Sequence, residues 1–352
     1  MAFALAASAD TSKLVAPTET CRDEEWEAFT ASLSPLLESS LTWDAVTFGP
    51  APEKLLEATR RLCLDPKAKR TRPRVSYLSA RTLGAPESVA LAVASAVELF
   101  HVGSLMHDDV LDEADERRSQ PTLKALWGNS RAVLAGDLAL SLGLAMLRAT
   151  PRETIVAAAN AVLCMTNGAI AEGRVRGDST VTPAIWRRIA AGKTGALFAF
   201  SGVGVAQAVS SLVAVERFSR YGEHVGVAFQ IADDLLDGVA DIKGRERFAD
   251  LRNREMNLPT VLGCAMSASF RAEVTRIWAQ EQVSSGDAEY LGGLLMTSGA
   301  PAAAFEQLCA ELTGACEALQ PYADHPAGAQ LISWAMSIRQ RTLAALSHHL
   351  VS

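Results

Sequence analysis

The residues with the clearest chemical meaning in this sequence form two short acidic clusters, each with the pattern Asp-Asp-x-x-Asp. Their members are Asp108, Asp109, Asp112, Asp233, Asp234 and Asp237. On a helix, the first and last Asp of each cluster lie four residues apart, so their charges repel unless a partner compensates them. Solvated surface acids would explain one such cluster. Two clusters that both follow strongly apolar runs indicate a shared chemical use.

A divalent metal ion is the compensating partner that these residues favour. Mg²⁺ prefers oxygen ligands and is usually held by one or two carboxylates together with substrate phosphates. The sequence has neither the spacing of an EF-hand loop nor Cys and His residues spaced for zinc. We therefore predict that the two clusters bind Mg²⁺ around one diphosphate substrate.

Cationic side chains near the clusters would bind the same substrate. Lys193 interrupts the apolar helical run 189–200, where a lysine is rare unless it pairs or reaches solvent. Arg117 and Arg118 follow the first cluster closely. His101 precedes that cluster by two helical turns on the same expected face. An anion held by the clusters would meet positive charge at these positions.

A basic segment, residues 65–74, lies earlier in the chain. It contains Lys69, Arg70 and Arg72 between two prolines. Taken alone, such a run of charge is more typical of a solvated connector than of a binding site. We expect it to be a loop, and its cations are among the anion ligands that the sequence offers.

Helices must position these side chains, because apolar residues repeat with helical rather than strand periodicity. The first cluster ends a long helix that begins after Pro86, and the second ends a helix over 212–238. One face of the first helix holds Val89, Val93, Val97, His101, Leu105, Asp108 and Asp112. Another helix begins at Glu24, and further helices are predicted over 130–148, 153–174, 183–205, 258–279, 305–319 and 328–349. We predict an all-α fold with a loose tail over 1–20 and a single domain over 21–352.

Composition limits the classes of function. The 40 acidic residues exceed the 33 basic ones, giving a net charge of −7, which argues against an extended nucleic-acid surface. The six cysteines show no C-x-x-C spacing, which indicates reduced thiols. We find no secretory signal and no apolar run long enough to span a bilayer. The sequence therefore predicts a cytoplasmic protein without a transmembrane segment.

Several motifs occur together in a fixed order over about residues 50–260. They are Lys69-Arg70-x-Arg72-Pro73, Glu98-Leu99-x-His101, Asp108-Asp109-x-x-Asp112 followed by Arg117-Arg118-x-x-Pro121-Thr122, Ala135-Gly136-Asp137, Lys193-Thr194, and Phe229-Gln230-x-x-Asp233-Asp234-x-x-Asp237. In this combination the chain resembles a trans-isoprenyl diphosphate synthase of the polyprenyl synthetase family. The resemblance implies a single-domain bundle of roughly ten or more helices around a central cavity, and a homodimer.

The resemblance also implies an activity and a role for each site residue. An allylic diphosphate (dimethylallyl, geranyl or farnesyl) would be condensed head to tail with isopentenyl diphosphate, giving an all-trans prenyl diphosphate. Asp108, Asp112 and Asp233 would bind Mg²⁺, about three ions per active site, with Asp109, Asp234 and Asp237 helping indirectly. The allylic diphosphate would contact Arg117, Lys193 and Arg245. Isopentenyl diphosphate would contact Lys69, Arg70, Arg72, His101 and Arg118, and Thr194 and Gln230 would lie near the developing cation.

The sequence departs from the family after the second cluster. The family usually has a Gly-Lys-x-x-Gly-x-Asp-Leu segment and then a Gly-Lys before Leu-Pro. This chain has Arg245 at the first lysine and Arg254-Glu255 before Leu258-Pro259. Glu255 reverses the charge near an anion, unless Arg254 takes the place of the missing lysine.

These departures leave other activities open. The same metal and diphosphate chemistry could cyclise a prenyl chain or prenylate another acceptor. A non-catalytic partner subunit is disfavoured, because both acidic clusters are intact. Intact isopentenyl ligands favour chain elongation, because a cyclase has no second diphosphate to hold.

Product length depends on the residues before the first cluster. In the family, bulky residues four or five positions earlier block the tunnel for the growing chain. Ser104 and Gly103 at these positions are small, and Phe100 lies one turn deeper. We predict products of C20 or longer, with Phe100 as the floor of the tunnel.

Overall fold

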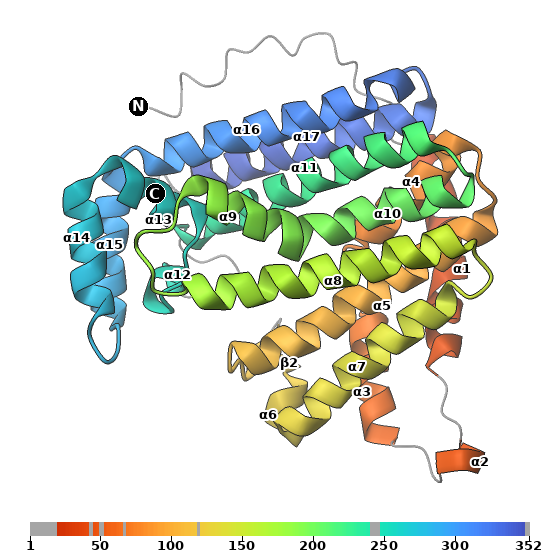
Figure 1. The fold of residues 1–352 in the computed structure, drawn as a ribbon, viewed down its shortest axis with the longest axis horizontal. Helices are drawn as coiled ribbons and strands as arrows, with labels where there is room; N and C mark the ends of the chain where they lie inside the picture. Colours follow the sequence, from red (N-terminus) through yellow and green to blue (C-terminus); the bar gives the residue numbers. More distant parts are fainter. Residues whose placement is uncertain are drawn as a thin grey trace. The chain divides into compact units, whose positions relative to one another are not determined.

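The computed structural model describes residues 20–41, 45–48, 53–65, 68–117, 120–239 and 247–348, and helices dominate them (Figure 1). The predicted all-α class is confirmed. Strands in the described residues are limited to β1 (Glu116–Arg117) and β2 (Gln120–Pro121), an antiparallel pair just after the first acidic cluster.

Contacts within the chain define two compact units, each of which contains one acidic cluster. The first-cluster unit consists of Pro17–Val162 and Phe200–Glu216. The second-cluster unit includes Leu163–Ala199 and Arg217–Ser352. The single domain over 21–352 stays a prediction. The predicted tail lies outside the described residues except for Thr20, which begins the first helix.

The first-cluster unit is built around one long helix. Its helices are α1 (Thr20–Ser40), α2 (Ala45–Phe48), α3 (Glu53–Cys63), α4 (Thr71–Leu83), α5 (Glu87–Leu111), α6 (Leu123–Trp127), α7 (Asn129–Met146), the first part of α8 (Arg152–Val175), the end of α10 (Ala196–Ala208) and the start of α11 (Leu212–Asp237). Helix α5 packs most extensively against α7 and α4. Residues 93–100 of α5 are all buried, so the predicted apolar stripe is only part of a helix that is buried on every side. A central helix of this kind holds the first cluster at its end.

The second-cluster unit continues α8 and adds the C-terminal half of the chain. Its elements are α9 (Pro183–Ala190), η2 (Ala191–Gly195), the start of α10 (Ala196–Ala208), most of α11 (Leu212–Asp237), α12 (Ala249–Arg252), α13 (Leu258–Met266), α14 (Ala268–Trp278), α15 (Ser285–Thr297), α16 (Ala300–Leu319), η3 (Gln320–Tyr322) and α17 (Pro326–His348). Helices α16 and α17 lie side by side, as do the shorter α14 and α15 (Figure 1). The second cluster ends α11.

Between α9 and α10 the chain forms one turn of π-helix, η2, which contains Lys193. Glycines let the neighbouring helices approach this turn. A Cβ on Gly168 of α8 would lie 2.3 Å from the backbone nitrogen of Lys193. A Cβ on Gly226 of α11 would lie 2.4 Å from the Cα of Gly195. Only glycine permits such approaches, so the backbone around Lys193 is closely packed between α8 and α11. Single π-turns inside helices are frequent at functional sites.

The structure differs from the predicted elements at several places. The predicted helix 258–279 is two helices, because Ser267 adopts an extended conformation and its hydroxyl caps α14 by accepting from the Phe270 nitrogen at 3.1 Å. The predicted loop 65–74 is helical from Thr71, since Pro73 is tolerated in the first turn of α4. Helix α15 occupies a stretch where no helix is predicted, and a capping box between Ser284 and Asp287 starts it.

Among the described residues, three helices are long and apolar enough to span a bilayer by length and composition alone, which corrects the expectation that no such run exists. They are Glu87–Leu111, Arg152–Val175 and the continuous helical run Pro183–Ala208. In the first and third, 67% and 61% of the apolar window is buried, so packing accounts for much of their apolar character. In the second, only 28% of the window is buried.

Candidate functional site

The first acidic cluster lies where α5 ends. Asp112 is the residue that caps the C-terminal end of the helix, and its side chain is exposed. Asp108 is half-buried, whereas Asp109 is only 2% exposed. Arg117 of β1 donates a 2.7 Å hydrogen bond from Nε to Asp109 Oδ1. The three carboxylates therefore have different environments, and the middle one already has a cationic partner.

Burial raises the pKa of Asp109, and Asp112 raises it further, whereas the charge and the hydrogen bond of Arg117 act in the opposite direction. A buried carboxylate costs free energy unless a cation or hydrogen-bond donors compensate it. Arg117 thus stabilises the turn that joins α5 to the β1–β2 pair. Sequence reasoning assigned Arg117 to the substrate alone and missed this contact.

The basic segment before α4 uses one of its cations inside the protein. Arg70 has a positive φ of 47°, and its guanidinium donates to the carboxylate of buried Glu98 and to the carbonyl oxygen of Cys63. Lys69 is exposed, and Arg72 and His101 are half-buried. Arg118 lies outside the described residues. The contacts of Arg70 are those of a group that anchors this segment to α5.

The three residues predicted to set product length are packed differently from one another. Phe100 is fully buried and lies 6.1 Å from the ring of Phe200, measured between centroids. A Cβ on Gly103 would lie 3.0 Å from the Gly136 carbonyl oxygen and 3.2 Å from the Leu140 side chain. The small size of Gly103 is therefore used for close packing of α5 on α7. Ser104 is half-buried and donates to the His101 carbonyl oxygen at 2.8 Å.

The second acidic cluster lines a pocket of about 190 Å³ within the second-cluster unit. Asp233 is exposed, Asp237 is half-buried and Asp234 is buried. Apolar lining residues include Trp186 and Ile189. The charged side chains that line the pocket are Glu172, Arg176, Lys193, Asp233, Asp234, Asp237, Asp250 and Glu255. Carboxylates outnumber cations, so the pocket attracts cations.

A chain of hydrogen bonds fixes the side chains next to Lys193. The Thr194 hydroxyl donates to Gln230 Oε1 at 2.9 Å, and Gln230 Nε2 donates to Asp234 Oδ1 at 2.9 Å. The other oxygen of Asp234 accepts from the Leu258 nitrogen at 2.8 Å. Burial, and then the charge of Asp250, raise the pKa of Asp234 well above its ordinary value, against the effect of these two donors. Asp234 is therefore an anchor for Gln230 and for the start of α13.

Asp237 connects α11 to the segment after it. Both of its carboxylate oxygens accept weakly from the Asp250 nitrogen, at 3.3 and 3.4 Å. Asn257 donates to Asp250 Oδ2 at 2.9 Å, and its own Oδ1 caps α13 by accepting from the Thr260 nitrogen. Sequence reasoning missed Asp250 and Asn257, although Asn before Leu-Pro is a recognisable helix start. Arg245 lies outside the described residues.

The cations of the pocket are ion-paired. Lys193 contacts the carboxylate of Glu172, and Arg176 Nη2 lies 3.2 Å from Glu255 Oε1. Arg254, in contrast, donates from Nη2 to the carbonyl oxygens of Gln280 at 2.6 Å and Glu281 at 2.9 Å. The alternative in which Arg254 replaces the missing lysine is not supported, because its guanidinium is used in these contacts. Glu172 and Arg176 were not among the predicted site residues.

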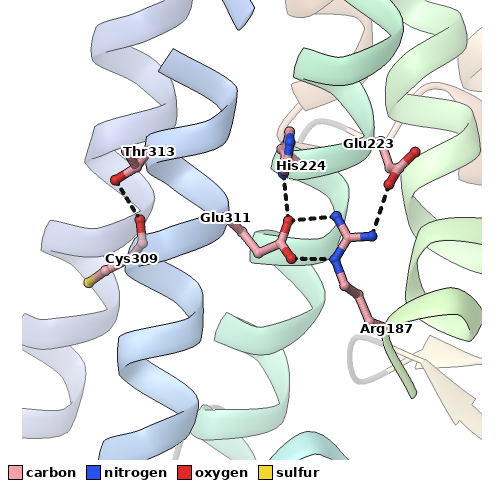
Figure 2. Close-up of polar contacts among 6 residues, drawn as sticks. All are labelled: Arg187, Glu223, His224, Cys309, Glu311 and Thr313. Atoms are coloured by element: carbon pink, nitrogen blue, oxygen red, sulfur yellow. Dashed lines mark hydrogen bonds and ion pairs between the residues drawn. The ribbon is translucent and has the colours of Figure 1, made fainter. Parts of the chain in front are cut away.

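A polar network connects α9, α11 and α16 (Figure 2). Arg187 binds both oxygens of Glu311, at 2.6 Å from Nε and 3.0 Å from Nη2, and Glu223 at 3.0 Å from Nη1. His224 Nδ1 lies 2.7 Å from Glu311 Oε2. Paired guanidinium contacts of this kind are geometrically specific. The network holds α9, which continues into Lys193, against the helix that bears the second cluster.

Similarity to known proteins agrees with this arrangement. Residues 53–293 match the sequence profile of a family described as Polyprenyl synthetase. The chain is 36% identical over 208 residues to the (2E,6E)-farnesyl diphosphate synthase of Mycobacterium tuberculosis, covering 57% of this chain and 58% of that protein. It thus spans somewhat more than half the length of this curated relative.

Two solved structures share the fold over most of the chain. A decaprenyl diphosphate synthase from Rhodobacter capsulatus has a TM-score of 0.82 at 27% identity, with 91% of this chain and 98% of that chain covered. A polyprenyl synthase from Caulobacter crescentus CB15, complexed with calcium and isoprenyl diphosphate, has a TM-score of 0.80 at 26% identity, with 90% and 95% covered. With the family profile matching more than half of its residues, this chain belongs to the polyprenyl synthetase family.

Proposed function

We propose that this chain is a trans-prenyltransferase that condenses an allylic diphosphate with isopentenyl diphosphate. The observation that carries the proposal is the second-cluster pocket, where motif carboxylates and Lys193 line one cavity in a member of the polyprenyl synthetase family. The Caulobacter crescentus relative that binds calcium and isoprenyl diphosphate supports a metal ion and a diphosphate as the ligands.

The donor atoms of the pocket fit Mg²⁺. Its metal-binding side chains are carboxylates, and neither His nor Cys is among the residues that line it. In the part of the chain that the structure describes, no three such side chains form a ready metal cage. This agrees with an ion that takes one or two carboxylates and fills its other positions with phosphate and water. When bound, Mg²⁺ would neutralise the charge of the diphosphate leaving group.

Asp233 and Asp237 of the second cluster, and Asp108 and Asp112 of the first, would supply the carboxylate ligands of about three ions. Asp109 and Asp234 are buried and would act indirectly, through Arg117 and Gln230. Lys193 would exchange Glu172 for the allylic diphosphate. Arg117 and Arg245 stay part of this proposed ligand set.

Thr194 and Gln230 are proposed to stabilise the developing allylic cation, and Gln230 lines the pocket. The hydrogen of the Thr194 hydroxyl is directed to Gln230, so the lone pairs of the hydroxyl oxygen are left for the substrate. Gln230 cannot rotate without losing its bond to Asp234. An oxygen held in this way stabilises positive charge without having to reorganise.

In the proposed reaction, the carbon–oxygen bond of the allylic diphosphate breaks and the electron pair leaves with the diphosphate. The isopentenyl double bond attacks the allylic cation and forms the new carbon–carbon bond. A proton then passes to the released diphosphate. Trp186 and Ile189 give the pocket an apolar wall that would exclude water from the cation.

Isopentenyl diphosphate would bind to the basic residues of the first-cluster unit. Lys69, Arg72, His101 and Arg118 are its proposed ligands. Arg70, whose guanidinium contacts Glu98 and the Cys63 carbonyl oxygen, would position this segment. We also propose that the product has at least C20, although the packing of Gly103 leaves Ser104 and Phe100 to set that length.

We propose a homodimer as the functional form, and cytoplasmic localisation stays a prediction. Three apolar residues of α8 lie seven residues apart on one face and are 48%, 58% and 57% exposed: Val156, Leu163 and Ile170. On α7, Leu134 is 60% exposed. An exposed apolar stripe of this kind is typical of a protein–protein interface. Light scattering after size exclusion should give twice the mass of the chain, and Leu163→Glu should give the monomer.

Product analysis tests the activity. The purified protein is incubated with Mg²⁺ and each allylic primer, with and without isopentenyl diphosphate, and the products are identified by mass spectrometry. Elongated linear diphosphates that form only with isopentenyl diphosphate are expected. A cyclised product that forms without isopentenyl diphosphate would instead favour a terpene cyclase, and products that require another acceptor would favour a different prenyltransferase.

A further inference from the structure

Arg176 and Glu255 form an ion pair at the pocket of the second cluster. Arg176 follows the last residue of α8, Glu255 lies in the segment between α12 and α13, and both line the pocket. Arg176 Nη2 lies 3.2 Å from Glu255 Oε1, and the side chains are 42% and 36% exposed. The pair therefore lies at the border between the pocket and solvent, where a ligand has access to both groups.

The backbone next to each member holds the pair in place. The nitrogen of Gly177 donates to the carbonyl oxygen of Arg254 at 2.9 Å, so the residues adjacent to Arg176 and Glu255 are bonded to each other. Gly177 and Arg254 both have positive φ, 78° and 60°. This turn directs the Arg254 guanidinium to the carbonyl oxygens of Gln280 and Glu281. Of the two arginines, Arg176 rather than Arg254 is therefore the one that pairs with Glu255.

The pair contributes little to folding. Half-exposed ion pairs add little to stability, because water screens them and side-chain entropy opposes them. A guanidinium can bind a phosphate through two parallel charge-assisted hydrogen bonds, because its planar group suits phosphate as well as carboxylate. Arg176 can thus exchange Glu255 for phosphate at low cost.

The C-terminal end of α8 and the residue after it bring opposite charges to the pocket, since Glu172 and Arg176 both line it. Glu172, four residues before Arg176, contacts Lys193. Each of these two cations is thereby held by a carboxylate near the carboxylates of the second cluster. Their placement around one pocket matches a ligand that is itself a polyanion with bound cations, such as a magnesium diphosphate.

We propose that Arg176 is a diphosphate ligand of this chain, in place of the lysine expected at position 255, and that Glu255 is the residue that positions its guanidinium. The positive charge that the family has before α13 would then be supplied by Arg176, after the end of α8. The negative charge of Glu255 stands where the family has the lysine. The inference rests on the proposed function, since it names a residue that binds the allylic diphosphate.

Direct binding separates this inference from the proposed function. The probe is geranyl thiolodiphosphate, which resists ionisation, titrated calorimetrically into the full chain with Mg²⁺. Arg176→Gln should weaken binding at least tenfold, whereas Arg174→Gln, an exposed arginine two residues earlier on α8, should bind as the wild type does. A wild-type chain that binds no probe would contradict the proposed function. Wild-type affinity in Arg176→Gln would overturn only the role of Arg176.

A charge exchange tests the shared subsite. Glu255→Lys alone should not strengthen binding, because the new lysine would repel Arg176. The double variant Arg176→Gln/Glu255→Lys should recover affinity to within about threefold of wild type, with circular dichroism as the check on folding. If Glu255→Lys raised the affinity for the probe equally in the wild-type chain and in Arg176→Gln, the proposal would be overturned. So would a double variant that binds no better than Arg176→Gln.

Discussion

Arg117 donates a 2.7 Å hydrogen bond from Nε to Oδ1 of Asp109, the middle carboxylate of the first Asp-Asp-x-x-Asp motif. The motif is therefore not a set of three equivalent ligands. Asp109 is buried against its cation at the end of α5, while Asp112 reaches solvent. The second motif shows the same pattern of burial, since its middle residue Asp234 is buried and hydrogen-bonded while Asp233 is exposed. In both, the middle residue is buried and hydrogen-bonded, whereas the outer residues are half-buried or exposed.

Asp108→Asn and Asp233→Asn should each reduce turnover at least 100-fold, the usual scale for removing one group that stabilises developing charge. Circular dichroism should show unchanged helix content, because neither side chain is fully buried. Asp324→Asn, an exposed aspartate between η3 and α17, is the matched control and should retain activity. Retained turnover in either motif variant would contradict its role as a metal ligand.

Arg117→Ala should destabilise the chain by about 1–3 kcal/mol, because it leaves the buried carboxylate of Asp109 without its cation. Urea denaturation measures the change. Adding Asp109→Asn to the variant should recover part of the loss, since the buried charge is then gone. If Arg117→Ala unfolds at the wild-type urea concentration, the pair has no structural role and Arg117 serves the substrate alone.

Thr194→Val should lower kcat about 10- to 100-fold with little change in KM for either substrate. Valine keeps the shape of threonine but removes the oxygen that would face the cation. Thr194→Ser, which keeps the hydroxyl, should stay within a few fold of wild type. Steady-state kinetics with both substrates varied separates the two parameters. A valine variant with wild-type kcat would remove Thr194 from the proposed stabilisation of the cation.

Glu311→Gln should cost about 1–3 kcal/mol of stability near neutral pH. Burial raises the pKa of Glu311, but His224 and Arg187 outweigh it, so the pKa is below its ordinary value. A carboxylate with a lowered folded-state pKa stabilises the fold above its unfolded pKa of about 4.3, and this contribution is lost as pH falls through the folded value. The difference between wild type and variant should therefore shrink on acidification.

Urea denaturation at several pH values measures this difference, and Glu317→Gln on the exposed side of α16 is the control. If the difference in unfolding free energy between wild type and Glu311→Gln grew on acidification, the ion pairs of Glu311 with Arg187 and His224 would be contradicted.

Ser104→Phe should shorten the products by at least one isoprene unit, because a bulky side chain at this position would narrow the proposed tunnel for the growing chain. Gly103→Ala should instead lower stability by about 1–3 kcal/mol, since its methyl group would press on the Gly136 carbonyl oxygen and Leu140. Chromatography of dephosphorylated products gives the chain length, and thermal unfolding gives the stability. A wild-type enzyme that stops at C15 would contradict the predicted product length.

Some of the fold follows directly from local sequence. The helix α7 is observed over Asn129–Met146 against a predicted 130–148, because helical periodicity and turn residues are local signals. The break at Ser267 within 258–279 and the helix α15 depend on caps, which are single hydrogen bonds that compete with continued periodicity. Element boundaries are therefore less predictable than the elements themselves.

The sequence by itself determined the all-α class, the two acidic motifs and the family, because residue type and spacing express them directly. Only the tertiary structure decided which carboxylates are accessible, that Arg254 is turned to Gln280 and Glu281, and that Arg176 is the cation beside Glu255. The physical reason is that burial and pairing join residues such as Arg176 and Glu255, 79 positions apart, which no local periodicity connects.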